Sequence, residues 1–506
     1  MFDKYPRLIA FVAGALAATG FAPLNLWPMT LVGLALLLGL IRRAPHWRAA
    51  AARGWWWGWG HFIINCNWIA HAFTFQEAMP HWLGYGAVVG LAAFLGLYVS
   101  LVGATSWWVR ARGLPFTLIF AASWVFSEYA RSTLFSGYIW DPLGVVLINT
   151  ILAAPARYIG TYGLSGLVAS LAGLSLLRAT SARLLFIVAI LLVWLGGRLD
   201  AGFYINPRIR VSEPLLIVVQ PNIPESDRHD PKTDFANLIK LMRSSGSVEP
   251  NHPRLILWPE GALSDYPEED QYARERLATL LGPKDVLVAG GEALIFDRKI
   301  LPGGGIQRKL IAAHNSTFVL NSTAQLIGRY DKAHLVPGGE YLPLRAFATA
   351  LGLARLVPGD LDFVPGPGPR TLTVPGFGKM GNVICYEIIF SGEVVDRSNR
   401  PDFIFNPSSD AWFGAWGPPQ HLAQAQMRAL EEGIPIVRAT PTGISAVISG
   451  EGRIMRSLPA NTQGSIAFPI PQALPPTLFA RYGNAIPLML AAIFAIVGIA
   501  LARRTS

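Results

Sequence analysis

Long apolar runs limit how this chain can fold more than any other feature of its sequence. Seven runs lie before residue 200 and an eighth lies near the C-terminus, centred on LIAFVAGALAATGFAP, LVGLALLLGLI, WWWGWGHFIINCNWIAHAF, GYGAVVGLAAFLGLYVSLVGA, FTLIFAASWVFSEYA, GLSGLVASLAGLSLL, LLFIVAILLVWLGG and AIPLMLAAIFAIVGIALA. A bilayer core requires about 20 apolar residues per helix. No convincing cleavage site precedes the second run, so we expect the first to be a transmembrane span and not a signal peptide. We therefore expect about eight transmembrane helices, which agrees with a chain that is 52% hydrophobic and only 15% charged.

The positions of lysine and arginine predict the orientation of these helices. The basic residues cluster at alternate ends of the runs: Lys4, Arg7; Arg42, Arg43, Arg48, Arg53; Arg110, Arg112; Arg178, Arg183; Arg503, Arg504. By the positive-inside rule both termini are cytoplasmic and the long segment after the seventh run lies outside the cytoplasm. This topology also explains the net charge of +10. We do not expect a nucleic-acid partner, because the sequence has neither zinc-finger spacing nor a basic stripe interleaved with aromatic residues.

Residues 205–480 differ in character and predict a folded α/β domain. Short β-branched runs (LLIVVQ, RLILW, DVLVAG, NSTFVLN, LIGRYD, GNVIC, DFIFNP, IPIVRAT and SAVISG) recur between turns, and helical patterns such as DFANLIKLMRS and QHLAQAQMRALEEG separate several of them. Strands that alternate with helices are typical of layered α/β folds. We expect a membrane domain of seven helices over 1–204, an extracytoplasmic catalytic domain over 205–480, and an eighth helix with a cytoplasmic C-terminus over 481–506.

The chain has two cysteines, which is too few for a disulfide framework. Cys66 lies in the third apolar run, whereas Cys385 ends the strand-like stretch GNVIC. An unpaired cysteine is commonly a buried and inert small residue. Here the following YEIIFSGEVVDRS has a helical pattern, and a helix N-terminus stabilises a thiolate. Cys385 is therefore also a candidate nucleophile.

Two other strand ends carry charged residues that suit the same chemistry. RLILWPEGAL places Glu260 after a buried run, and IGRYDKAHLVPGGEYLP places Lys332 and Glu340 around a turn. Each has an ordinary alternative, a helix N-terminal glutamate for the first and a solvated surface ion pair for the second. Together with Cys385 they supply a base, an oxyanion stabiliser and a nucleophile for acyl transfer through a covalent intermediate.

The same stretches resemble a known family. WPEGA, YDKAHLVPGGEY and GNVICYEIIF resemble the Glu, Lys and Cys motifs of the nitrilase superfamily, and NPSSDAWFGAWGPPQHLAQAQMRALEEGIPIVRATPTGISAVISGEGRI resembles the stretch that follows the cysteine there. In the apolar half, SEYARSTLFSGYIWDPLG and RYIGTYGLSG are similar to signatures of the apolipoprotein N-acyltransferases, the membrane-embedded branch of that superfamily.

This resemblance implies a nitrilase-like αββα sandwich on a base of about eight membrane helices, in a bacterial inner membrane with the catalytic domain on the periplasmic side. It implies that a phospholipid, chiefly phosphatidylethanolamine, donates its sn-1 acyl chain to Cys385 as a thioester in a ping-pong reaction. The acceptor would be the α-amine of an S-diacylglyceryl-cysteine apolipoprotein. One stretch departs from the family: PNIP is followed by ESDRHDP, with His229 near a position where the family often has tryptophan.

Chemistry assigns a role to each residue of this group. Glu260 takes and returns protons, while Lys332 favours the thiolate and, with the backbone N–H after the cysteine, stabilises the oxyanion. Glu340 orients Lys332 or the nucleophile, and Tyr386 and Glu387 support the site. No metal or cofactor is expected, because the nine histidines are scattered and no HExxH motif or cysteine cluster occurs.

A lipid substrate also needs an apolar entrance. Residues 344–359 have the pattern of an amphipathic helix, and DAWFGAWG carries Trp412, Phe413 and Trp416 in a glycine-flanked loop. Ordinary core packing is the alternative for both. For the loop we favour a mobile lid that dips into the membrane interface.

The apolar half holds several polar residues. Glu128 and Arg131 lie one helical turn apart in the fifth run. They have two alternative interpretations, a functional site inside the membrane and an ion pair near the bilayer surface. His61, Asn65 and Asn67 in the third run are expected to bond between helices.

Two other functions fit part of this evidence. A membrane-tethered nitrilase-type amidase would use the same three residues and differ only in letting water reach the thioester. A non-catalytic scaffold that binds lipoproteins would not need Glu260, Lys332 and Cys385 together at strand ends.

Overall fold

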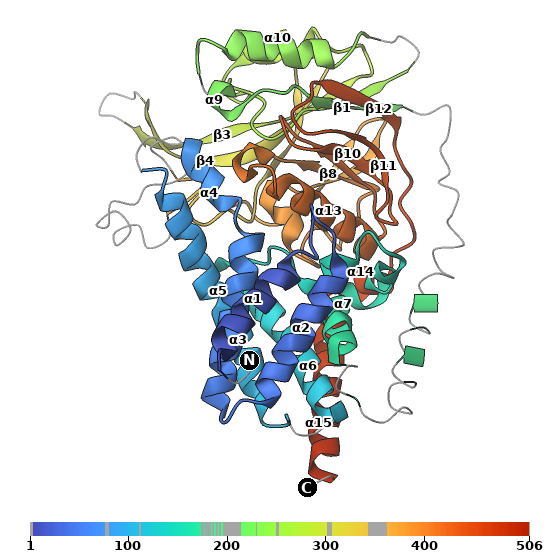
Figure 1. The fold of residues 1–506 in the computed structure, drawn as a ribbon. Helices are drawn as coiled ribbons and strands as arrows, with labels where there is room; N and C mark the ends of the chain where they lie inside the picture. The colour runs from blue at the N-terminus through green and yellow to red at the C-terminus, as the bar shows by residue number, and fades with distance from the viewer. Residues whose placement is uncertain are drawn as a thin grey trace.

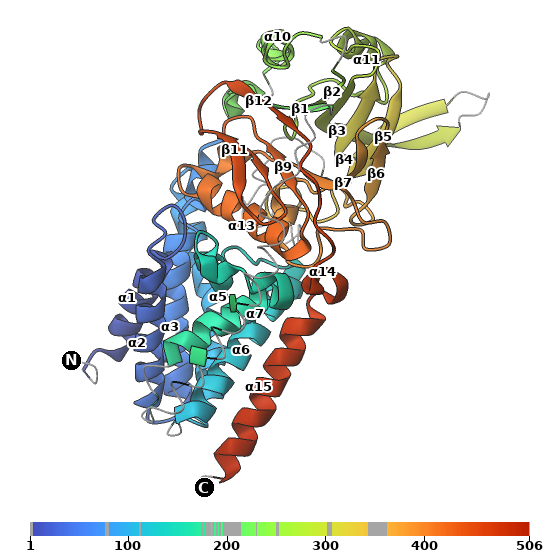
Figure 2. The same cartoon turned by 90° about the vertical axis from the view of Figure 1, so that its right-hand side faces the viewer.

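Helices from the N-terminal half pack side by side into a base, and the strands of the C-terminal half stack on one end of it in this computed structural model (Figure 1). The structure describes residues 4–75, 80–110, 113–173, 214–228, 230–248, 252–300, 306–342 and 362–504, with a few single positions between 177 and 195. The last helix runs back along the base, so both ends of the chain lie at the base and away from the sheets (Figure 2).

Every predicted apolar run that falls within the described residues forms a helix of the base. These helices are α1 (Pro6–Ala18), α2 (Trp27–Arg42), α3 (Trp47–Asn65), α5 (Leu83–Trp107), α6 (Gly113–Thr133), α7 (Ala156–Gly173) and α15 (Ala485–Arg504). Short segments join them: α4 (Ile69–Ala72), η1 (Phe73–Phe75), η2 (Leu134–Ser136), η3 (Leu143–Leu147), η4 (Ile151–Ala153) and α14 (Leu478–Tyr482). The seventh run, 184–197, lies largely outside the described residues.

Two of the described helices, α5 and α15, are long and apolar enough to cross a membrane by length and composition, and α1 and α2 are shorter apolar helices. Small residues bring the helices of the base close together. A Cβ on Gly14 would lie 1.9 Å from the Trp57 carbonyl oxygen, and one on Gly60 would lie 2.1 Å from that of Phe11. Such contacts are typical of helices that pack in a bilayer. The topology of eight spans stays a prediction.

Two six-stranded sheets form the second part of the molecule. The first has the order β12-β1-β2-β3-β4-β5 and the second has the order β11-β10-β9-β8-β7-β6. Their strands are β1 (Leu215–Gln220), β2 (Arg254–Leu257), β3 (Val286–Ile300), β4 (Ile306–Asn321), β5 (Leu326–Asp331), β6 (Thr371–Val374), β7 (Gly378–Asn382), β8 (Phe403–Pro407), β9 (Ile436–Ala439), β10 (Ser445–Ile448), β11 (Ile454–Leu458) and β12 (Gly464–Pro469). In each sheet three neighbouring strands are parallel, β1-β2-β3 and β7-β8-β9. All nine strands expected from the sequence are present.

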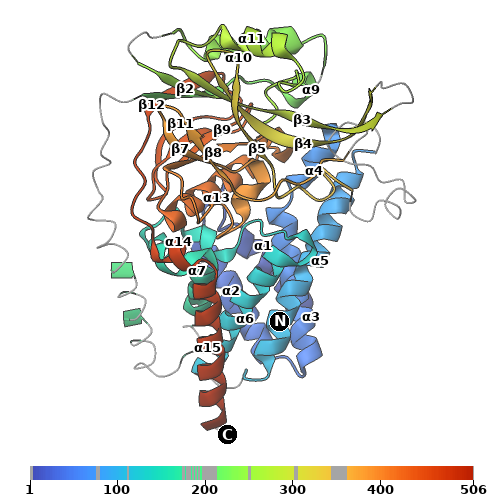
Figure 3. The same ribbon diagram turned by 180° about the vertical axis from the view of Figure 1, so that it is seen from behind.

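Helices cover both outer faces of the paired sheets. α9 (Glu225–Arg228), α10 (Asp234–Ser244) and α11 (Gln271–Ala278) lie on the side away from the base, and α13 (Gly417–Glu432) lies between the second sheet and the base (Figures 2 and 3). Every residue of α13 except Pro419 is buried. This order of layers confirms the predicted αββα sandwich.

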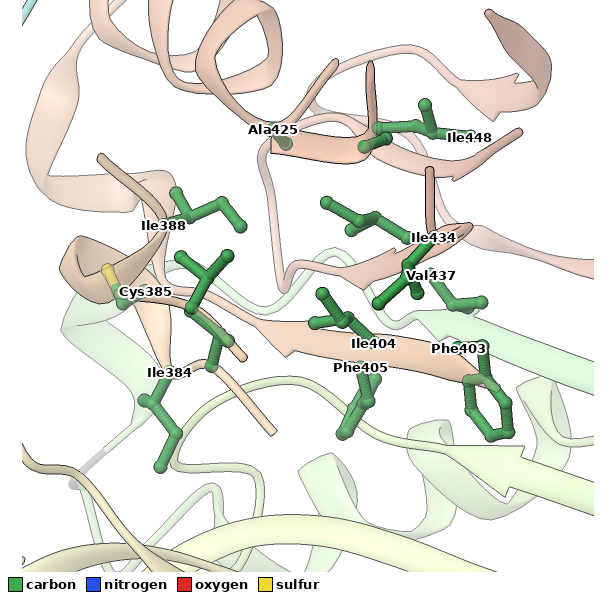
Figure 4. Packing of buried hydrophobic residues seen from close by; sticks show 14 of the residues in the cluster. Ile384, Cys385, Ile388, Phe403, Ile404, Phe405, Ala425, Ile434, Val437 and Ile448 are labelled. Atoms are coloured by element: carbon green, nitrogen blue, oxygen red, sulfur yellow. The ribbon is translucent and has the colours of Figure 1, made fainter. Parts of the chain in front are cut away.

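A large apolar cluster fills the space around the second sheet and continues into the base. Ile404 and Phe405 of β8 and Val437 of β9 lie at its centre, and Cys385 lies at its margin (Figure 4). Fully buried strands with alternating large side chains fix the register of the sheet. The ends of those strands are thereby held in place.

Candidate active site

The structure brings together the three strand ends that the sequence singled out. Glu260 follows β2, Lys332 follows β5 and Cys385 follows β7. The Lys332 Nζ donates to Glu340 Oε1 at 2.9 Å and lies 3.5 Å from Glu260 Oε1. The Cys385 thiol lies close enough to the Glu260 carboxylate for the two groups to affect each other's ionisation. All four side chains are buried.

Two groups that the sequence analysis did not single out complete the environment of Glu260. The Asn315 amide of β4 donates to Oε1 of both Glu260 and Glu340 at 2.8 Å, and the backbone N–H of Ser409 donates to Glu260 Oε2 at 2.7 Å. Hydrogen bonds and a nearby cation stabilise an ionised carboxylate. Burial raises the pKa of Glu260, but the charges of Lys332 and Arg228 and the Asn315 amide outweigh burial and lower it overall.

Cys385 has an unusual backbone conformation. Its φ is +50°, in the left-handed region, and it begins a five-residue 3₁₀ turn, Cys385–Ile389, which is designated η6. Such conformations cost free energy in non-glycine residues and occur at functional sites. The prediction of a helix over YEIIFSGEVVDRS is wrong, because only this short turn forms there.

The predicted stabilisation of a resting thiolate is wrong. Burial raises the pKa of the Cys385 thiol, and the adjacent Glu260 carboxylate raises it further, so that it lies well above its usual range despite the opposing effect of Lys332. A turn this short has little dipole to offset burial. The pKa of Lys332 is raised, because Glu340 and Glu260 outweigh the effect of its burial. The resting site therefore combines a neutral thiol, an ionised carboxylate and an ammonium.

Glu387 joins the cysteine turn to the lysine loop. Its Oε1 accepts from the backbone N–H groups of Ala333 at 2.7 Å and His334 at 3.0 Å, and its Oε2 accepts from that of Ile384 at 2.6 Å. The Tyr330 hydroxyl donates to the same carboxylate at 3.0 Å. Glu387 thus fixes the spacing between Lys332 and Cys385 through the backbone on either side.

Glu340 and Tyr386 also have defined places. Glu340 Oε2 accepts from the backbone N–H of Val336 at 2.8 Å, so this carboxylate is fixed by its own loop while it bonds Lys332. The Tyr386 hydroxyl donates to the Gly137 carbonyl at 3.0 Å, which connects the cysteine turn to the base.

The three aromatic residues of the predicted lid lie near α13 but differ in exposure. Phe413, in η7 (Asp410–Phe413), is buried against Trp68 at 4.5 Å and Trp140 at 5.4 Å between ring centroids. Trp412 and Trp416 are only partly buried, and Trp412 contacts Phe75 at 5.3 Å. Phe413 therefore belongs to the aromatic contact between the base and the sandwich.

The polar residues of the base bond locally. Glu128 Oε1 accepts from the Trp124 indole at 2.9 Å and the Leu143 N–H at 2.8 Å, and Arg131 donates to the Trp140 carbonyl at 2.9 Å. Both side chains are buried.

In α3 the ring of His61 bonds Asn65 of the same helix at 3.1 Å. Within the described residues no group of three or more His, Cys, Asp or Glu side chains could hold a metal ion. Residue 229 and the segment 344–359 lie outside the described residues.

Arg228 is a further functional candidate that sequence analysis missed. It donates to the Gly261 carbonyl at 3.1 Å and to the Ser409 hydroxyl at 2.9 Å, and its charge acts on Glu260. Its only sequence signal was its place beside His229, in the stretch that departs from the family. Asn315 gave no signal, because an asparagine in a strand is recognisable as a site residue only when its neighbours in space are known.

The αββα sandwich with Glu260, Lys332 and Cys385 at three strand ends defines a protein of the nitrilase class. The family model for carbon-nitrogen hydrolases matches residues 218–474, and the model for the apolipoprotein N-acyltransferase N-terminal domain matches residues 13–174. The chain belongs to the apolipoprotein N-acyltransferase family of enzymes.

Relatives named apolipoprotein N-acyltransferase match nearly the whole chain. That from Rhodopseudomonas palustris is 32% identical over 94% of this chain and 91% of its own length, and that from Bradyrhizobium diazoefficiens is 33% identical over 97% and 94%. Among solved structures, an amidase from Nesterenkonia sp. is similar at 20% identity, with 52% of this chain and 92% of the amidase covered and a TM-score of 0.32.

Proposed function

We propose that this enzyme transfers the sn-1 acyl chain of a phospholipid, chiefly phosphatidylethanolamine, to the N-terminal amine of a diacylglyceryl apolipoprotein through a thioester on Cys385. The observation that carries this proposal is the meeting of Cys385, Glu260 and Lys332 in one buried site, where Lys332 Nζ lies 3.5 Å from Glu260 Oε1 and the carboxylate acts on the thiol. A base must lie within hydrogen-bond distance of the proton that it removes.

In the first half-reaction Glu260 takes the thiol proton as Cys385 Sγ attacks the ester carbonyl carbon. Lys332 and the backbone N–H of Tyr386 stabilise the tetrahedral oxyanion. The bond from carbon to the glycerol oxygen then breaks, and Glu260 returns its proton to that oxygen. The products are a lysophospholipid and the Cys385 thioester. Glu340 keeps Lys332 in place and does not exchange protons.

In the second half-reaction the lipoprotein amine replaces the lysophospholipid. Its ammonium loses one proton to solvent before it enters the site, and Glu260 takes the second proton as the amine nitrogen attacks the thioester carbonyl. The carbon–sulfur bond breaks, Cys385 recovers a proton from Glu260, and the product carries an amide-linked third acyl chain. Buried surroundings limit the access of water, which would otherwise hydrolyse the thioester.

Placement in the membrane completes the proposal. Eight spans divide the chain into a membrane domain over 1–204, a catalytic domain over 205–480 on the periplasmic side of the inner membrane, and a last helix over 481–506 with both termini cytoplasmic. The distribution of lysine and arginine supports this orientation. The partly buried Trp412 and Trp416 are candidates for the lipid entrance.

The test uses purified protein in detergent with phosphatidylethanolamine labelled on its sn-1 chain and no acceptor. We expect label on the wild type that neutral hydroxylamine releases, and none on Cys385→Ala or Glu260→Gln. Added diacylglyceryl peptide should then discharge the label as an amide. Free fatty acid as the only product would favour an amidase-like hydrolase, and absence of label from a folded wild type would favour the scaffold.

A further inference from the structure

The strained conformation of Cys385 requires a support that the reaction sequence above does not supply. Because φ is +50° at this residue, its carbonyl group is turned away from the pattern of the preceding strand. The backbone carbonyl oxygen of Cys385 bonds the His421 ring, with Nε2 at 3.1 Å. His421 lies on α13 and is completely buried. A side chain from a helix of the outer layer thus contacts the backbone of the proposed nucleophile.

The neighbours of His421 determine which ring nitrogen carries the proton. A carbonyl oxygen can only accept, so Nε2 must donate to Cys385. The other nitrogen, Nδ1, lies 2.9 Å from Arg438 Nη2, which can only donate, and 3.0 Å from Asp410 Oδ1, which already accepts from the same guanidinium. Burial and the Arg438 charge lower the pKa of His421, which favours a neutral ring. A ring protonated only at Nδ1, toward Asp410, would turn a lone pair toward the carbonyl oxygen of Cys385.

Arg438 is in turn fixed by β8 and the segment that follows it. It donates to Asn406 Oδ1 at 2.6 Å, to Ser408 Oγ at 2.9 Å and to Asp410 Oδ1 at 2.5 Å. Asp410 balances its charge, and both groups are buried. Ser409, between two of these partners, supplies the N–H that bonds Glu260. One guanidinium therefore holds the supports of both Cys385 and Glu260.

We propose that His421 is a positioning residue, set in its Nε2–H form by Arg438, which holds the Cys385 carbonyl and thereby directs the thiol at Glu260. This inference rests on the proposed function, because it concerns the nucleophile of that reaction. Small misplacements of a reacting group can slow a reaction by about 10²-fold. The support is thus expected to affect the rate of acyl-enzyme formation and to leave lipid binding unchanged.

A matched pair of substitutions tests the assignment. In His421→Gln the amide nitrogen replaces Nε2 and can still donate to the Cys385 carbonyl, whereas in His421→Asn it replaces Nδ1 and cannot extend that far. Both variants, in a Cys66→Ala background, are assayed for single-turnover thioester formation and for alkylation of Cys385 by iodoacetamide. We expect His421→Gln to stay within about threefold of the parent, and His421→Asn to lose about 10²-fold in rate at an unchanged half-saturating lipid concentration.

Equal rates in the two variants, whether both normal or both lost with a lower melting temperature, would overturn the assignment. Ring nitrogen shifts of the wild type, measured by solid-state NMR, need no variant to fold. A proton on Nε2 alone supports the proposal, and a proton on Nδ1 refutes it. If the wild type forms no thioester, the proposed function fails, yet alkylation and the ring shifts still decide the role of His421.

Discussion

At the scale of single residues, the site is a set of buried charges arranged around one neutral thiol. Glu260 and Glu340 share the Lys332 ammonium, and the Glu260 carboxylate faces Cys385. A carboxylate beside a thiol opposes its ionisation, so the proton leaves only when the sulfur forms its bond with carbon. This arrangement protects the thiol from ionisation in the resting enzyme.

Removal of the Glu260 charge should make Cys385 ionise more easily while it stops acyl transfer. In Glu260→Gln the repulsion that raises the pKa of the thiol is gone and the attraction of Lys332 remains, so the pKa of Cys385 should fall. The pH dependence of iodoacetamide alkylation measures this shift. Glu269→Gln, at a surface pair with Arg308, is the control and should not change the profile. A higher pKa in Glu260→Gln would contradict the arrangement.

The Lys332 charge should matter for stability as well as for chemistry. Lys332→Met removes the ammonium that Glu260 and Glu340 share, and breaking a buried pair costs about 3–5 kcal/mol. Lys332→Met combined with Glu340→Gln should recover part of this loss, because one of the two carboxylates becomes neutral. Thermal unfolding in detergent measures both variants. Equal melting temperatures for the single variant and the wild type would refute this account.

At the scale of elements, α13 connects the sandwich to the base. Arg428 and Glu431 of α13 form an ion pair at 2.6 Å, and Thr161 of α7 donates from its backbone N–H to Glu431 at 2.5 Å. Trp140 of the base donates to Gln420 at 2.8 Å. Such buried polar contacts form only when the sandwich and the base have one particular relative orientation, so they fix that orientation.

The segment before α13 allows a test of the lid, because adjacent aromatic residues have different environments there. Phe413→Ala removes a buried ring and should lower stability by about 3–5 kcal/mol. Trp412→Ala removes a half-buried ring and should reduce turnover on lipid vesicles far more than it reduces the melting temperature. An equal loss of turnover and stability in Trp412→Ala would show that Trp412 only packs the core.

At the scale of the whole molecule, orientation in the membrane is the property that most needs a measurement. Tyr272 on α11, in the layer on the side away from the base (Figure 3), is 73% exposed, and Trp47, the first residue of α3, is 43% exposed. In a Cys66→Ala, Cys385→Ser background, Tyr272→Cys should react in intact spheroplasts with a reagent that cannot cross the membrane. Trp47→Cys should react only after permeabilisation. The reverse pattern would place the sandwich in the cytoplasm.

Local sequence determined much of this protein. Apolar runs of sufficient length specify the helices of the base, and β-branched runs bounded by turns specify the strands, since both patterns depend on neighbours in the chain. Glu260, Lys332 and Cys385 were recognisable because charged or reactive residues at the ends of buried strands are costly unless they are used. The αββα layers and the family followed from the same motifs.

Only the tertiary structure decided the ionisation of Cys385 and the groups that surround it. The motif at GNVIC predicted a helix and a stabilised thiolate, whereas the fold supplies a short turn, a buried thiol and a nearby carboxylate. Asn315, Ser409 and His421 join the site from β4, the segment after β8 and α13. The pKa of a group depends on charges and solvent within a few ångströms. Those neighbours are distant in the chain, so the sequence determined the reacting groups and the fold determined their state.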